Sequence, residues 1–159
     1  MTRQSLERAL PAGQGLLLDT SALIAYLGQP QVATPVAKYV VDDFVRPGRN
    51  PAIVSMVTAM EVLIGPLEIG VGDEYRHTID FLLHFPNLRP FAVDIHVAHE
   101  AAMLRAQHHF RVQDALVIGS GLVAQVGYLV TNDKAWRNKL GSSTDRIRVC
   151  YLEEHLPLS

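Results

Sequence analysis

The sequence predicts a single α/β domain with a short, largely parallel sheet, and three observations support this prediction. Short apolar runs that suit buried strands alternate along the chain with longer segments of helical pattern. The length of 159 residues is close to that of one domain and allows a sizeable buried core. With 48% apolar and 19% charged residues, the composition excludes a disordered, collagenous or coiled-coil protein.

The first strand and helix follow from the run GLLLD and the residues after it. Residues 15–19 form a short apolar segment typical of a strand that is buried on both faces. Thr20 and Ser21 can cap the helix expected at 22–27, which ends at the helix-breaking residues 28–30. Ahead of this strand we expect a polar lead-in with one short helix.

Proline and glycine mark the next boundaries. Pro35 suits the first position of a helix over 36–45, and PGRNP at 47–51 interrupts the chain. A second strand is expected at 52–55 and a helix at 56–68. Beyond these, the pattern predicts helices at 73–83, 94–109 and 113–125, and strands at 89–93, 128–131 and 147–151.

Charge and cysteine content restrict the class of protein. The 14 basic and 16 acidic residues give a formal net charge of −2, so binding to a nucleic acid needs a local cluster of basic residues. The single cysteine, Cys150, excludes an internal disulfide framework and a cysteine-rich zinc module. The N-terminal residues lack an apolar core of signal-peptide type, and polar residues interrupt the most apolar stretch. We therefore expect a cytoplasmic protein without a membrane span.

Three carboxylates direct attention to one edge of the sheet. Asp19 and Asp133 end predicted strands, and Asp114 opens the helix that leads into the strand before Asp133. Because ligands of parallel sheets bind at the carboxyl ends of the strands, these three side chains can meet there. Each has an alternative interpretation as a helix cap, a turn residue or a first-turn carboxylate favoured by the helix dipole.

Glu61 is harder to explain as a structural residue. On a helix it shares a face with Val57 and Ile64, so its carboxylate interrupts a stripe that is expected to face the core. The alternative is a capping box formed by Thr58 and Glu61, which would start the helix later. An inward carboxylate without a partner is costly, so we expect a cation or another polar group nearby.

Together the four carboxylates predict a metal site. At one sheet edge they would repel one another unless a divalent cation held them. Ligand sets made only of oxygen atoms select Mg²⁺ or Mn²⁺ over zinc. Such a site supports hydrolytic displacement at phosphorus, because the metal activates water and neutralises the developing charge.

Four segments, in this order, resemble a known family. They are LLLDTSALIAYL, VTAMEVLIG, VQDALVIGSGLVAQVGYLVTNDKAW and the closing strand around Val149. On these motifs the chain resembles PIN-domain ribonucleases, and more narrowly the VapC toxins of bacterial toxin–antitoxin pairs. The resemblance implies a PIN-like three-layer α/β/α domain with a short, mostly parallel central sheet over residues 15–152. Residues 1–14 are then a lead-in and residues 153–159 a C-terminal tail.

Carried over by position, the acidic constellation of the family falls on the four carboxylates found above. The resemblance implies that Asp19, Asp114 and Asp133 bind Mg²⁺ or Mn²⁺. Glu61 is then a further ligand or orients the attacking water. The residues expected to support the carboxylates are Ser21, Thr131 and Asn132.

Basic residues flank two of the acids, and two departures from the family pattern lie among them. The candidates for a cationic rim that binds RNA phosphates are Arg111, Lys134 and Arg137, and ordinary solvated helix ends are the alternative. The basic residues around them are Arg105, His108, His109 and Lys139. Many relatives carry a proline where this chain has residues 110–113. Lys134 places a cation directly after the fourth acid.

The resemblance implies a metal-dependent endoribonuclease that hydrolyses RNA phosphodiester bonds as the toxin of a toxin–antitoxin pair. It also implies a homodimer and a small antitoxin protein as partners, for which apolar helices at 36–45 and 57–67 are the expected surfaces. Two other classes stay open. One is a non-catalytic RNA- or protein-binding module that keeps the fold, and the other is a nuclease that acts on structured DNA.

Two further motifs compete with this interpretation. Gly119 and Gly121 fit a dinucleotide-binding fingerprint, but too few residues follow Gly121 for a crossover helix. We therefore expect no nucleotide cofactor. We expect the two glycines to permit close packing of the helix that contains them. His96 and His99 can place two zinc ligands on one helix face, but no further motif completes the set. We expect these histidines to be surface or partly buried residues.

Overall fold

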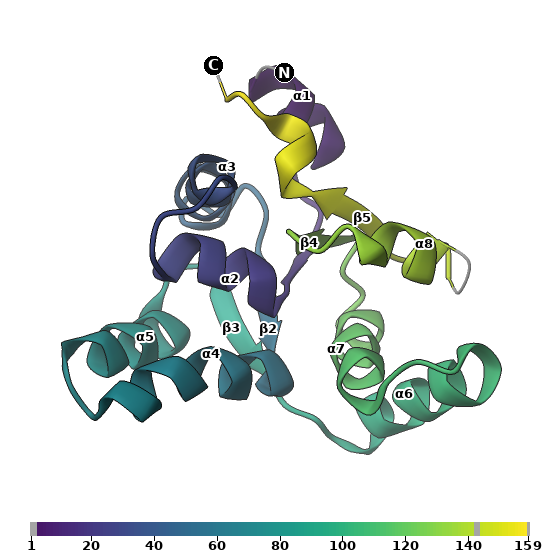
Figure 1. Ribbon diagram of the computed structural model, residues 1–159. Coiled ribbons are helices and arrows are strands. Elements are labelled where there is room, and N and C mark those ends of the chain that lie inside the picture. The colour runs from purple at the N-terminus through teal and green to yellow at the C-terminus, as the bar shows by residue number, and fades with distance from the viewer. Residues whose placement is uncertain (1–2, 142–143, 159) are drawn as a thin grey trace.

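A five-stranded sheet forms the centre of the computed structural model, which describes residues 3–141 and 144–158 (Figure 1). The strands are β1 (Leu16–Leu18), β2 (Ala52–Ser55), β3 (Leu88–Phe91), β4 (Tyr128–Thr131) and β5 (Arg148–Tyr151). Their order is β3-β2-β1-β4-β5, and all neighbouring pairs are parallel. The chain thus builds the sheet outward from β1 to β3 and then adds β4 and β5 on the other side, so the strand order reverses between β1 and β4.

Helices cover both faces of this sheet, which gives the three layers that the sequence predicts (Figure 1). Side chains alternate along β1, where Leu16 and Leu18 lie in one apolar cluster and Leu17 lies in the other. The first cluster includes residues of α1 (Arg3–Ala9), α2 (Thr20–Leu27), α3 (Thr34–Lys38), the π-helix η1 (Tyr39–Val45), α4 (Met56–Ile69) and α5 (Asp73–His84). The second includes residues of α6 (Ile95–His108), α7 (Val112–Val123) and α8 (Ala135–Gly141).

Two parts of the predicted helix pattern were wrong. The helix expected at 36–45 is divided, because α3 ends at Lys38 and the chain continues as the wider π-helix η1. The helix α8 had not been expected. Its first residue, Ala135, donates its backbone N–H to Asp133 Oδ1 at 3.0 Å, so an acid of the strand end starts this helix.

The lead-in contributes to the core, because Leu6 and Leu10 are fully buried in the first apolar cluster. It also contacts the 3₁₀-helix η2 (Leu152–His155), where Ser5 Oγ lies 3.4 Å from His155 Nδ1. Cys150 is a buried core residue, as predicted, and its Sγ lies 3.7 Å from His155 Nε2. Residues 1–2 of the predicted lead-in and residue 159 of the predicted tail lie outside the described part of the chain.

The competing motifs have structural explanations. Helix α7 runs through Gly119 and Gly121, so no strand precedes the glycines as a dinucleotide fold requires. A Cβ atom on Gly121 would lie 2.9 Å from Leu17 Cδ2, which shows that this glycine permits α7 to pack closely on the sheet. His96 and His99 are exposed on α6. None of the helices within residues 3–141 and 144–158 is long and apolar enough to cross a membrane.

Candidate active site

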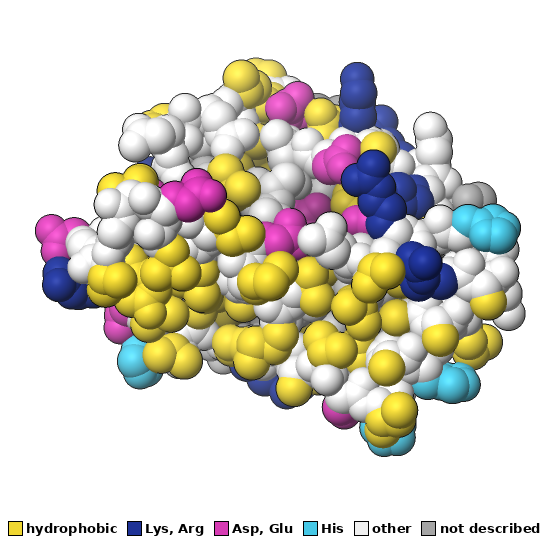
Figure 2. All heavy atoms as spheres, turned by 60° about the horizontal axis from the view of Figure 1, so that its bottom comes forward, with side chains coloured by type: hydrophobic (Ala, Val, Ile, Leu, Met, Phe, Trp, Pro, Cys, Tyr) yellow, Lys and Arg dark blue, Asp and Glu magenta, His cyan; other side chains and the backbone are white. Residues whose placement is uncertain are grey.

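The four carboxylates line one cavity of about 260 Å³ at the carboxyl ends of β1 and β4. Asp19 follows β1, Asp133 follows β4, and Glu61 and Asp114 lie on α4 and α7. The strand order reverses at this point of the sheet, which is the usual ligand site of open parallel sheets. Figure 2 shows acidic side chains in a hollow, with a broad apolar surface on one side and basic side chains on the other.

Asp19 is the most deeply buried of the four carboxylates, with 6% of the residue exposed. Its Oδ1 accepts hydrogen bonds from Ser21 Oγ at 2.7 Å and from the Ala22 backbone N–H at 3.0 Å. Its Oδ2 accepts a hydrogen bond of 2.5 Å from Thr131 Oγ1. The bond from Ala22 makes Asp19 the N-cap of α2, so the cap interpretation of Asp19 is also correct. The caps expected at Thr20 and Ser21 were wrong, because both residues lie inside α2. Burial raises the pKa of Asp19 although these hydrogen bonds lower it, and the Asp133 carboxylate adds to the rise.

Hydroxyl groups connect Asp19 to the segment that carries Asp133. Thr131 Oγ1 accepts the Asp133 backbone N–H at 3.0 Å, and Ser21 Oγ accepts the Asn132 backbone N–H at 2.8 Å. Each hydroxyl directs its single proton to Asp19 and uses its oxygen to hold the chain after β4. Ser21 and Thr131 therefore position two acids relative to each other.

The side chain of Asn132 has a different role from the one expected. Its Nδ2 donates a hydrogen bond to Glu153 Oε1 at 3.1 Å, and Tyr151 donates its hydroxyl proton to the other Glu153 oxygen at 2.9 Å. The Asn132 amide is therefore directed to the C-terminal segment, and the residue supports the acids through its backbone N–H. The sequence did not point to Glu153, because its contact with Asn132 joins two segments that follow different strands, β4 and β5.

Glu61 lies in the cavity, although the structure overturns both the argument made for it from the sequence and the alternative to that argument. Helix α4 begins at Met56, where Ser55 Oγ accepts the Val57 backbone N–H at 3.2 Å, so Thr58 forms no capping box with Glu61. Ile64 is 47% exposed, so the stripe that it shares with Glu61 does not face the core. Burial raises the pKa of Glu61, the Thr20 hydroxyl lowers it, and the carboxylates of Asp114 and Asp19 raise it further.

Thr58 is a cavity residue to which sequence reasoning gave no role in the site. It is fully buried, lines the cavity with the four acids, and its hydroxyl has no hydrogen-bond partner among the residues that the structure describes. Buried hydroxyls are normally satisfied by a protein group or by water. A polar ligand or a bound water in the cavity would satisfy this one.

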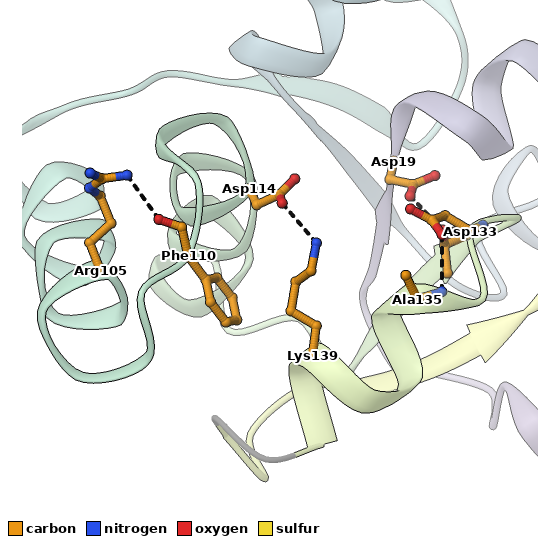
Figure 3. Close-up of polar contacts among 8 residues, drawn as sticks. Asp19, Arg105, Phe110, Asp114, Asp133, Ala135 and Lys139 are labelled. Atoms are coloured by element: carbon orange, nitrogen blue, oxygen red, sulfur yellow. Dashed lines mark hydrogen bonds and ion pairs between the residues drawn. The ribbon is translucent and has the colours of Figure 1, made fainter.

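Asp114 forms an ion pair that was not predicted. Lys139 Nζ of α8 lies 2.9 Å from Asp114 Oδ2 (Figure 3). The same ammonium lies 4.6 Å from the centre of the Trp136 ring, which lines the cavity and packs against Phe110. The sequence predicts a metal ligand or a first-turn carboxylate at Asp114, and the structure adds the Lys139 ammonium as its partner.

The three residues of the candidate RNA rim differ in their surroundings. Arg111 and Lys134 are exposed next to the two acids that they neighbour in sequence. Arg137 forms an ion pair with Glu154 and stacks over the ring of Tyr151, 4.6 Å from its centre. Its guanidinium is therefore held against the C-terminal segment.

The donor chemistry of the cavity fits a hard divalent cation. The side-chain atoms of the cavity that can bind a metal are carboxylate and hydroxyl oxygens, which suits Mg²⁺ or Mn²⁺. Among residues 3–141 and 144–158, no group of three or more His, Cys, Asp or Glu side chains is already arranged to hold a metal ion. Mg²⁺ usually keeps several waters and binds through one or two carboxylates, so it does not need such a preformed group. The Thr58 hydroxyl, which has no partner among the described residues, lines the same cavity.

The sequence matches the PIN domain family over residues 16–139. Several solved structures share the fold. VapBC2 from Rickettsia felis, bound to a promoter DNA fragment, has a TM-score of 0.67 at 12% identity over 86% of this chain and 98% of that chain. FitAcB from Neisseria gonorrhoeae has a TM-score of 0.63 at 18% identity, and the match covers 89% of this chain and 99% of that chain. The sarcin-ricin loop cleaving toxin VapC20 from Mycobacterium tuberculosis has a TM-score of 0.62 at 13% identity, and the match covers 82% of this chain and 97% of that chain. No curated protein matches the sequence significantly.

Proposed function

This chain belongs to the PIN-domain family, and from that premise we propose that it is a metal-dependent endoribonuclease and the toxin of a toxin–antitoxin pair. The observation that carries the proposal is the cavity in which Asp19, Glu61, Asp114 and Asp133 lie together at the switch point of the sheet. A non-catalytic module that keeps the fold has no need of four acids in one hollow. Their desolvation is costly unless a ligand compensates for it.

The chain's own residues supply binding, orientation and proton transfer. Asp19, Asp114 and Asp133 would hold Mg²⁺ or Mn²⁺, directly or through its bound waters, and the metal when bound would activate water and neutralise charge on the phosphate. Ser21 and Thr131 orient Asp19 for this role. Glu61 lines the same cavity and would orient the attacking water or accept its proton at Oε1 or Oε2.

RNA is the substrate that we propose. Arg111 and Lys134 are exposed near the acids and can bind phosphates on either side of the scissile bond. One structural relative is described as cleaving the sarcin-ricin loop, which supports RNA rather than DNA as the substrate class. Arg137 is held by Glu154, so we assign it no direct contact with RNA.

The partners that we propose are a second copy of the chain and a small antitoxin. Relatives with this fold include a toxin–antitoxin complex from Klebsiella pneumoniae. Of the two helices expected to offer association surfaces, the segment 36–45 buries its apolar side chains, including Val40 and Phe44. The other, α4, exposes one apolar face next to the cavity, formed by Met56, Met60, Ile64 and Leu67. Association is therefore expected through α4.

Cleavage of a single-stranded RNA by the purified protein tests the nuclease. We expect cleavage with Mg²⁺ or Mn²⁺, none in EDTA, and a loss of nearly all activity in Asp19→Asn with the fold intact by circular dichroism. Asp73→Asn is the matched control, because Asp73 is an exposed acid of α5 outside the cavity. Full activity of Asp19→Asn or of the wild type in EDTA contradicts the metal-dependent mechanism. Cleavage of structured DNA instead of RNA would favour the alternative DNA nuclease.

The toxin role has a separate test. Expression of the wild type, but not of Asp19→Asn, is expected to arrest growth of a bacterial host. Co-expression of the short reading frame next to the gene is expected to restore growth and to yield a complex on purification. Growth that is unaffected by an active nuclease would contradict the toxin role and leave the nuclease proposal in place.

A further inference from the structure

A cation forms an ion pair with one of the four acids that line the cavity. The side chain of Lys139 is 34% exposed and that of Asp114 is 24% exposed, so the 2.9 Å ion pair between them is partly withdrawn from water. Such a pair is screened less by solvent and salt than an ion pair on the open surface. The Lys139 ammonium therefore offsets the charge of the Asp114 carboxylate (Figure 3).

The surrounding residues fix the position of this ammonium. Trp136 is 5% exposed and packs edge-to-face against Phe110, with 6.3 Å between the ring centres. The Lys139 ammonium lies over the Trp136 ring at a distance typical of cation–π contacts. Both residues belong to α8, which begins next to Asp133. The helix thus extends from one acid of the cavity and presents its lysine to another.

This arrangement limits the number of divalent cations that the cavity can accept. A second ion bound through Asp114 Oδ2 would have to displace the ammonium or lie directly against it. Like charges at such short range in a partly desolvated site repel strongly. The ion pair uses one oxygen of Asp114, so the other oxygen and the three remaining carboxylates are not held by Lys139.

We propose that Lys139 takes the place of a second metal ion: the cavity binds one divalent cation, and the Lys139 ammonium is the positive charge that receives the RNA phosphate. An ammonium binds a phosphate oxygen as a point charge on a flexible stem. The contacts with Asp114 and Trp136 keep the ammonium at the cavity until the phosphate arrives. This inference rests on the proposed nuclease function and names the residue that contacts the substrate in the same cavity.

The number of bound Mn²⁺ ions tests the proposal without reference to activity. Unbound Mn²⁺ is measured by electron paramagnetic resonance, and quenching of Trp136, the only tryptophan of the chain, reports binding at this cavity. We expect one ion for the wild type and for Lys139→Arg, and a second ion for Lys139→Met. Lys38→Met removes an exposed lysine of α3 and is expected to keep the wild-type count. Thermal unfolding establishes that the variants are folded, and Lys139→Gln replaces Lys139→Met if the latter is not.

RNA affinity in Ca²⁺, measured by fluorescence anisotropy of a short labelled oligonucleotide, gives the second readout. We expect Lys139→Met to lose about tenfold in affinity and Lys139→Arg to lose much less. The proposal would be overturned by two Mn²⁺ ions of similar affinity on the wild type, or by an unchanged ion count in both Lys139→Met and Lys139→Gln. In either case, RNA cleavage by the wild type would keep the nuclease function. Conversely, the expected ion counts without any RNA cleavage would refute the nuclease and retain Lys139 as the resident cation.

Discussion

Thr131 and Asp19 are joined by a hydrogen bond of 2.5 Å that crosses from the end of β4 to the end of β1. Leu18 pairs with Val130 in the parallel ladder, so Asp19 and Thr131 occupy the next positions of the same register. The hydroxyl oxygen of Thr131 also accepts the backbone N–H of Asp133. One hydroxyl therefore couples the placement of two acids that are far apart in sequence, and the parallel register is what makes this possible.

Replacing Thr131 with valine is expected to weaken both the fold and the site. Asp19 Oδ2 loses its donor in a buried position, which typically costs about 1–3 kcal/mol of unfolding free energy. RNA cleavage is expected to fall as well, because neither Asp19 nor Asp133 is then held by this hydroxyl. Chemical denaturation in EDTA and the cleavage rate in Mg²⁺ are the measurements. Thr131→Ser keeps the hydroxyl and should retain most of the stability and most of the cleavage rate. A valine variant with the stability and cleavage rate of the wild type would contradict the role of this bond.

Replacing Thr58 with valine is expected to raise the unfolding free energy, in contrast to the same change at Thr131. The buried Thr58 hydroxyl has no partner among the residues described, so Thr58→Val removes a desolvated polar group at nearly constant volume. We expect the unfolding free energy in EDTA to rise by about 1 kcal/mol, and the stabilisation by Mg²⁺ to become smaller.

Thr78→Val provides the matched control for this substitution. Thr78 is also buried, but its hydroxyl donates a hydrogen bond of 2.9 Å to the Glu74 carbonyl oxygen. That variant should lose stability in EDTA. Equal losses for Thr58→Val and Thr78→Val would show that the Thr58 hydroxyl is satisfied in the folded protein and does not await a ligand.

The sequence was sufficient to find the acids but not the contacts between them. Asp19 and Asp133 follow apolar strands, and in a parallel sheet that position alone brings them to one edge. The partner of Asp114 could not be found in this way, because Lys139 is 25 residues away and lies on α8. That helix has seven residues and a mixed polar pattern, so it depends on packing of Trp136 and Leu140 for its stability.

The segment 36–45 shows a second limit of sequence patterns. Its apolar residues predict a helix, but the pattern does not distinguish an α-helix from a π-helix, whose hydrogen bonds span one residue more. Val40, Val41, Phe44 and Val45 are all buried, and η1 places them in the first apolar cluster. Tertiary packing thus selected a geometry that local propensity does not favour.

Acid is expected to destabilise the contact between the chain ends through His155. This residue is 5% exposed, and burial lowers its pKa below the usual 6.5, although Glu154 opposes the shift. Between the lowered pKa and 6.5 the unfolded chain binds more protons than the folded protein, so the unfolding free energy falls as the pH drops through that range. The contribution of neutral His155 is fully present above pH 6.5.

Melting temperatures at pH 7.5 and 5.0 measure this effect. His155→Gln cannot titrate and is expected to lose less stability on acidification than the wild type. His99→Gln, which alters an exposed histidine of α6, serves as the control and should follow the wild type. The same drop in melting temperature for His155→Gln and the wild type would show that the acid sensitivity has another source.

The last prediction concerns the lead-in, which precedes the part of the chain that matches the PIN domain family. Leu6 of α1 is fully buried in the first apolar cluster, so Leu6→Ala leaves a cavity there. Substitutions of this kind cost about 2–5 kcal/mol of unfolding free energy. Leu83→Ala, at a position that is 63% exposed on α5, should cost less than about 0.5 kcal/mol. Denaturant titration of both variants compares them directly. Similar small losses would mean that α1 is an appendage, whereas a large loss for Leu6→Ala alone would make the lead-in part of the domain that holds the acidic cavity in place.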